Sequence, residues 1–102
     1  KEVVLSARPI NAETALEWGL VNRICAPGKL MEEVLDVANA ICANAPLAVK
    51  QAKKSMNVSL DVDRKTSHRF ALEAYYRLVT SEDRHEGIRA FNEKRPPVFK
   101  GR

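Results

Sequence analysis

The sequence predicts a mainly helical protein with one short strand. Apolar residues recur at steps of three and four over most of the chain, and proline or glycine falls where these periodic segments stop. Only one stretch, residues 20–26, has the branched residues and partial alternation of a strand. The chain has 102 residues, 45% hydrophobic and 29% charged, which suffices for one domain with a modest core.

The N-terminal part contains a short helix, the strand and a turn. Asn11 is placed to cap a helix over residues 12–18, and Gly19 is expected to end it in a left-handed conformation. The strand over residues 20–26 is then closed by the turn that begins at Pro27. Because no cap precedes the first residues, we expect the chain to be the C-terminal portion of a longer protein.

Three helices are expected in the middle of the chain. The first, over residues 31–45, has the most regular apolar stripe. The second begins with proline at its first position and covers residues 46–58, and the third runs from the caps in residues 60–63 to residue 79. The second helix carries Lys50, Lys53 and Lys54 on one side, either as a solvated face or as a phosphate-binding cluster.

A last helix is expected from Thr80, with Asp83 three residues later as in a capping box. Lys94 and Arg95 would lie in its last turn, and the prolines that follow prevent its continuation. Phe91 is three residues from Lys94, so an aromatic ring and an ammonium group share a face. Such a face suits a ligand that combines a ring with phosphate, whereas the alternative is a solvated basic tail with Phe91 in the core.

Composition narrows the classes of function. The net charge of +4 favours anionic partners, and no apolar run approaches the roughly 20 residues of a membrane span. Two widely spaced cysteines argue against a metal site or a disulfide framework and fit the cytoplasm. His68 and His85 lie among charged neighbours, and no glycine-rich phosphate loop occurs. We therefore assign no catalytic residue, no metal ligand and no separate cofactor.

Two segments carry a family resemblance. The first lies in the tail and comprises Asp83, Glu86, Gly87, Ala90, Phe91, Glu93, Lys94, Arg95 and Phe99. The second lies upstream and comprises Ala15, Gly19, Leu20, Val21, Asn22 and Ile24. Together they resemble the C-terminal end of the crotonase family, the enoyl-CoA hydratases and isomerases.

The resemblance implies a fold and an activity for the complete protein. Members of this family are similar in having an N-terminal spiral with the oxyanion hole and catalytic glutamates, followed by a helical trimerisation region. Residues 1–28 would be the end of the spiral core, and residues 29–102 the helical oligomerisation region. The complete protein would be a trimer or hexamer that adds water across the double bond of a 2-enoyl-CoA thioester, in fatty-acid or related metabolism.

The resemblance also implies a ligand-binding edge. The positions of Tyr75, Phe91 and Lys94 match family residues that reach the adenine and phosphate end of coenzyme A. Tyr75 departs from the phenylalanine expected in hydratases. Two other classes stay open for the chain: a standalone helical oligomerisation module, or a basic helical RNA-binding module, although stacking aromatics are sparse for the latter.

Overall fold

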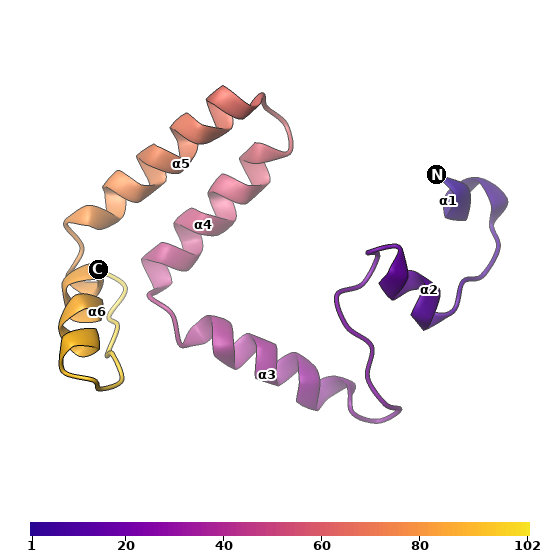
Figure 1. Cartoon of the computed structure of the whole chain (residues 1–102), viewed down its shortest axis with the longest axis horizontal. Coiled ribbons are helices and arrows are strands. Elements are labelled where there is room, and N and C mark those ends of the chain that lie inside the picture. The colour runs from indigo at the N-terminus through magenta and orange to yellow at the C-terminus, as the bar shows by residue number, and fades with distance from the viewer. The chain divides into compact units, whose positions relative to one another are not determined.

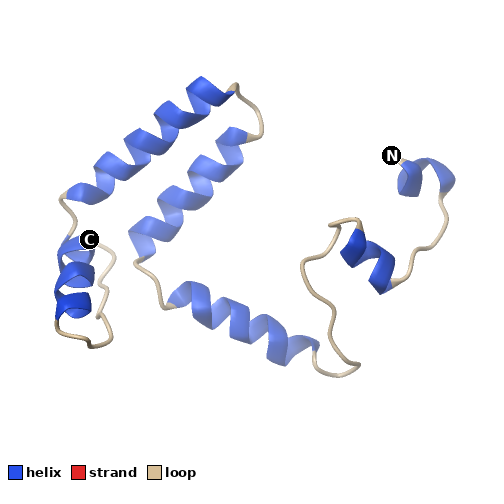
Figure 2. Cartoon of the chain, viewed as in Figure 1, coloured by secondary structure: helices blue, strands red, loops and turns tan.

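The computed structural model describes residues 1–102 as six α-helices and no strand (Figures 1 and 2). The helices are α1 (Glu2–Ser6), α2 (Ala12–Glu17), α3 (Leu30–Cys42), α4 (Pro46–Ser59), α5 (Arg64–Val79) and α6 (Glu82–Asn92). The predicted helical class is therefore confirmed. None of these helices is both long enough and apolar enough to cross a membrane.

The short strand predicted over residues 20–26 was wrong, because this segment is a turn and loop (Figure 2). A strand needs a neighbouring strand to pair with its backbone groups, and no strand exists in the chain to do so. Branched residues alone do not supply that partner. The segment is instead tied locally, since the amides of Leu20 and Val21 both donate to the carbonyl of Ala15, at 2.8 and 3.3 Å.

The chain divides into two units, Lys1–Asp36 and Val37–Arg102. The boundary lies within α3, so it does not coincide with the division predicted between residues 28 and 29. The assignment of these parts to a spiral core and an oligomerisation region stays a prediction.

In the first unit, local hydrogen bonds set the helix ends. The side chain of Asn11 accepts from the amide of Thr14 at 2.7 Å, as predicted for the cap of α2. Gly19 follows the helix with φ of 72°, the left-handed conformation that glycine adopts without a steric cost. No residue of this unit is buried, so its helices are held by their own backbone and caps.

In the second unit, α4 and α5 lie side by side as a helical hairpin (Figure 1). Pro46 occupies the start of α4, where its missing amide hydrogen costs nothing. Asp63 caps α5 by accepting from the amides of Lys65 and Thr66, at 2.9 and 3.1 Å. The Thr66 hydroxyl also donates to this carboxylate, and that bond, followed by the two amide bonds, lowers the pKa of the Asp63 carboxyl.

Burial is sparse in the whole chain. Ala90 and Asp83, both on α6, are the two buried residues, with exposed fractions of 1% and 2%. The apolar stripe predicted over residues 31–45 is present on α3 but lies open to solvent. Its exposed large members are Met31, Val34, Leu35 and Ile41. The buried residues of the second unit therefore lie on α6, and they do not form a large apolar core.

Candidate functional site

Helix α6 begins one residue later than the sequence predicted. Ser81 has the extended backbone of an N-cap, with φ −70° and ψ 146°, and its hydroxyl accepts from the amide of Arg84 at 3.2 Å. Thr80, the predicted cap, has φ −98° and ψ 2° and ends α5. The predicted capping box with Asp83 was wrong, because the carboxylate of Asp83 points to the C-terminal tail.

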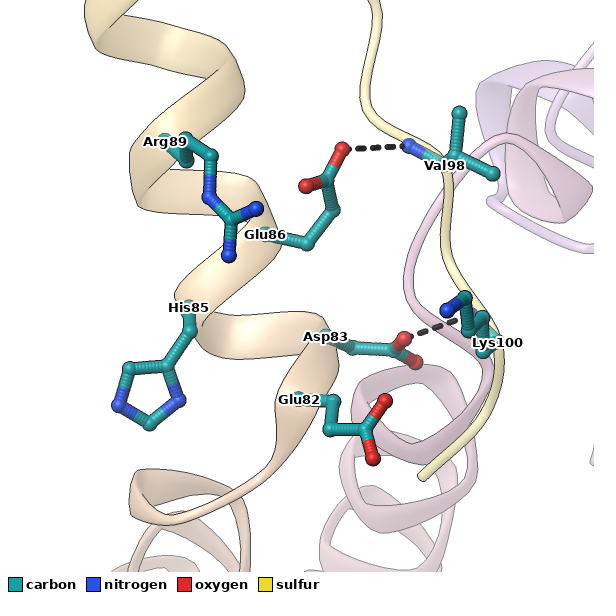
Figure 3. A pocket seen from close by; sticks show the side chains of 7 residues that line it. All are labelled: Glu82, Asp83, His85, Glu86, Arg89, Val98 and Lys100. Atoms are coloured by element: carbon teal, nitrogen blue, oxygen red, sulfur yellow. Dashed lines mark hydrogen bonds between the residues drawn. The ribbon is translucent and has the colours of Figure 1, made fainter.

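Asp83 fixes the end of that tail, residues 96–102, which we call the C-terminal strap. Its two carboxylate oxygens accept from the amides of Lys100 and Gly101, at 2.6 and 2.8 Å. Its own amide donates to the carbonyl of Arg102 at 3.1 Å. Figure 3 shows the Asp83 carboxylate directed at the strap beside α6. One buried carboxylate therefore ties together segments about 18 residues apart.

Glu86 fixes the beginning of the strap, one helical turn further along α6. Its carboxylate accepts from Nη1 and Nη2 of Arg95, at 2.6 and 3.1 Å, and from the amide of Val98 at 3.0 Å. The forked pairing with Arg95 and, to a smaller extent, the hydrogen bond from the Val98 amide lower the pKa of Glu86 to about 2. Arg95 also donates from Nε to the carboxylate of Glu93 at 2.5 Å. The hydrogen bonds to Glu86 and to Glu93 raise the pKa of Arg95.

The ring of Phe99 completes the contact between the strap and α6. It lies over Gly87, where a methyl group on the glycine would meet the ring edge at 3.7 Å. Further along, Gly101 adopts φ of 75° beside Pro46 at the start of α4. The strap thus connects α6 with α4 inside the second unit.

The end of α6 places Lys94 outside the helix. The helix ends at Asn92, and Lys94 has φ of 53°, the left-handed region that side-chain-bearing residues seldom adopt. The amide of Lys94 donates to the carbonyl of Phe91 at 3.2 Å, and the amide of Arg95 donates to that of Ala90 at 3.0 Å. This pair of bonds is a Schellman motif. The prediction that Lys94 and Arg95 lie in the last helical turn was therefore wrong.

Phe91 and Lys94 both face solvent. Phe91 is 84% exposed, so the alternative that placed it in the core was wrong for this chain. Lys94 makes no ion pair, and neither does Lys100, whereas Arg95 and Arg102 pair with carboxylates of α6. The basic tail is therefore half neutralised. An exposed aromatic residue and an unpaired ammonium group therefore lie three residues apart in sequence at the end of α6, but Lys94 is outside the helix and does not share a helical face with Phe91 as predicted.

Tyr75, the third predicted contact residue, lies on α5. Tyr75 is 51% exposed, and the centroid of its ring is 6.0 Å from that of the Tyr76 ring, with the two planes tilted by 59°. Tyr75 is thus accessible for stacking. Whether it joins Phe91 and Lys94 at one ligand stays a prediction.

A hollow of about 350 Å³ opens between α6 and the strap (Figure 3). It is lined by Glu82, Asp83, His85, Glu86, Arg89, Val98 and Lys100. The carboxylates of Asp83 and Glu86 are already occupied by donors, so neither is free to exchange a proton with a ligand. No group of three or more His, Cys, Asp and Glu side chains in the chain has an arrangement that would hold a metal ion.

Comparison with known proteins identifies the family. The family model described as enoyl-CoA hydratase/isomerase matches residues 1–102, the whole of this sequence. The chain belongs to the enoyl-CoA hydratase/isomerase family. The resemblance drawn from the tail and from the segment around Gly19 is thereby confirmed.

Individual relatives show how much of their own length this chain matches. The Bacillus subtilis protein YngF is 42% identical over 101 residues, which cover 99% of this chain and 39% of YngF. Carnitinyl-CoA dehydratase of Salmonella typhi is 37% identical over 105 residues, which cover 99% of this chain and 40% of the dehydratase. The crystal structure of enoyl-CoA hydratase from Bacillus anthracis superimposes with a TM-score of 0.91 at 37% identity, over 93% of this chain and 37% of that one. The chain thus spans about two fifths of the length of its curated relatives.

Sequence reasoning did not assign the two carboxylates that fasten the strap. The sequence assigned Asp83 to a capping box and Glu86 to the family motif, and neither assignment involves a contact with the strap. Their spacing of three residues puts both on one face of α6, and the prolines after Arg95 turn the chain back. These signals together could have indicated that the tail returns to this face.

Proposed function

We propose that this chain is the C-terminal helical part of an enoyl-CoA hydratase/isomerase that hydrates the double bond of a 2-enoyl-CoA thioester. The reaction would serve fatty-acid or related acyl-CoA metabolism in the cytoplasm. The family match over the whole chain supports the class of enzyme. The residues that polarise the thioester carbonyl and move protons would belong to the part of the relatives that this chain does not span.

The contribution we propose for this chain is to hold the nucleotide end of coenzyme A. The observation that carries it is that Phe91 is exposed and that Lys94, three residues later at the end of α6, makes no ion pair. A ring can lie against the adenine while an ammonium group meets a phosphate. Tyr75 would add a second aromatic contact. Coenzyme A is then part of the substrate and not a separate cofactor.

Substitution of Lys94 in the full-length protein tests this contact. We expect Lys94→Ala and Lys94→Gly to raise KM for a 2-enoyl-CoA about tenfold, because each removes a charge-assisted bond to phosphate. Kcat should stay unchanged, since the thioester end is not touched. The two variants differ in backbone preference, so an equal effect assigns the loss to the ammonium group. An unchanged KM in both variants would reject the contact.

The oligomeric state is a second part of the proposal. The exposed apolar stripe of α3 needs a partner surface, and we propose that the full-length enzyme covers it in a trimer or hexamer. Light scattering of the full-length protein measures this directly, and a monomer would contradict it. A standalone oligomerisation module would also use the stripe, but such a module needs no coenzyme A contact. Loss of affinity in the Lys94 variants therefore distinguishes the two.

An RNA-binding role is the weaker alternative. Lys50, Lys53 and Lys54 on α4 are exposed and make no ion pair, which is the observation that favours it. Binding through such a cluster would weaken steeply as salt is raised. A flat salt titration with single-stranded RNA would remove this alternative.

A further inference from the structure

Lys94 lies in a turn whose left-handed backbone conformation is unfavourable for lysine. A left-handed conformation costs a residue with a Cβ atom free energy, and glycine is the usual occupant of this position in a Schellman motif. Here the position holds lysine, with φ of 53°. The direction in which the Lys94 side chain leaves α6 therefore depends on whatever keeps this turn in place.

The residues after Lys94 supply the restraint. Arg95 returns to α6 and is held there by the forked pairing with Glu86. Three residues further on, the amide of Val98 donates to the same Glu86 carboxylate at 3.0 Å. A single side chain thus holds both ends of residues 95–98, directly next to Lys94. The Glu86 side chain is 16% exposed and the Arg95 side chain 35%, so water competes only partly for these bonds.

We infer that Glu86 is a positioning residue for the coenzyme A edge. By holding Arg95 and Val98, it fixes the left-handed turn and so sets the direction in which the Lys94 side chain leaves the end of α6. Glu86 itself touches no ligand in this arrangement. The inference rests on the proposed function, because Lys94 must meet coenzyme A for its direction to matter.

Asp83 provides a useful contrast within the same helix. It fastens the strap at Lys100 and Gly101, six and seven residues beyond Lys94. Glu82 pairs with Arg102 at 3.1 Å, still further along the strap. Loss of these contacts would free the end of the strap without releasing the turn at Lys94. The effect on ligand affinity should therefore be specific to Glu86.

A double-mutant cycle in the full-length protein tests the inference, with coenzyme A itself as the titrant. We expect Glu86→Gln to raise the Kd of coenzyme A about threefold to tenfold, because the neutral amide no longer holds the guanidinium fork. In a Lys94→Ala background the same substitution should change Kd less than about twofold, since its effect acts through Lys94. Glu82→Gln, on the same helix and also paired with an arginine, is the matched control and should leave Kd unchanged.

A steady-state measurement separates positioning from a general structural role. Glu86→Gln should raise KM for the enoyl-CoA and leave kcat unchanged, whereas a loosened fold would lower kcat as well. If Glu86→Gln does not fold, Arg95→Lys replaces it in the cycle, because lysine keeps the charge but not the fork. The same non-additivity with Lys94→Ala is expected.

The outcomes are distinguishable. If Lys94→Ala raises Kd and Glu86→Gln does not, the positioning role is overturned while the coenzyme A contact stands. Additive effects of the two substitutions also overturn the positioning role. If neither substitution changes Kd, both the inference and the proposed contact fail. A raised Kd for each single variant with no further loss in the double variant supports the inference.

Discussion

The two units of the chain are built from the same kind of element but are ordered by different interactions. In Lys1–Asp36 every residue is at least partly exposed, and the hydrogen bonds join residues close in sequence. In Val37–Arg102 a buried carboxylate and a part-buried one join α6 to a strap as many as 18 residues away. Helix formation therefore needs little beyond local sequence, whereas the arrangement of the strap depends on two specific side chains.

The difference is also one of expected stability. Val4 and Leu5 are 82% and 83% exposed, so the first unit buries little apolar area within this chain. Short helices without such burial are marginal in water. In the second unit, the strap gains order from charged and backbone partners that are partly shielded from water. We expect native-state hydrogen exchange to find the most protected non-helical amides in the strap.

The largest effect is expected at Asp83. Asp83→Asn keeps the shape of the side chain but replaces one acceptor oxygen by an NH₂ group. This group cannot accept a hydrogen bond, so the amide of either Lys100 or Gly101 loses its acceptor. We expect the free energy of strap opening to fall by about 2 kcal/mol, because a part-buried amide loses its partner on a buried side chain. Hydrogen exchange at the Lys100 and Gly101 amides in the full-length protein measures it. Asp61→Asn, at an exposed turn, is the matched control, and equal effects of both would contradict the role of Asp83.

A smaller, pH-dependent effect is expected at Glu86. Its pKa falls from 4.5 to about 2 on folding, so its contribution is fully present above about pH 4.5. As the pH falls from 4.5 toward 2, the carboxyl of the open strap takes up a proton first, and the contribution is lost. Wild-type protein and Glu86→Gln should therefore differ in strap opening at pH 5 and converge near pH 2. A difference that stays constant over this window would show that the Glu86 charge does not hold the strap.

The same contrast explains what could be predicted from sequence. The helices and their class follow from periodicity and from caps such as Asn11 and Asp63, which act within a few residues. The strand over residues 20–26 failed because a strand depends on a partner elsewhere, and local composition cannot provide one. The roles of Asp83 and Glu86 depend on a chain reversal after Arg95, which joins positions distant in sequence. The family motif indicated Phe91 and Lys94, but only the structure gave the left-handed turn that separates Lys94 from the helix.

The smallest effect comes from removing equivalent caps in the two units. Ser81→Ala and Asn11→Ala each delete the side-chain acceptor for one helix-start amide, at 3.2 and 2.7 Å. Each loss should cost its own helix about 1 kcal/mol. Because α6 is linked to the strap, Ser81→Ala should also lower protection of the Gly101 amide, whereas Asn11→Ala should affect α2 alone.

Residue-resolved hydrogen exchange of both variants checks this last difference. Ser59→Ala is the matched control, because the Ser59 hydroxyl donates to the Met56 carbonyl at 2.6 Å but caps no helix start. If Asn11→Ala lowered protection of the strap as much as Ser81→Ala does, the two units would be coupled. The order of α6 would then depend on the first unit as well as on its own two carboxylates.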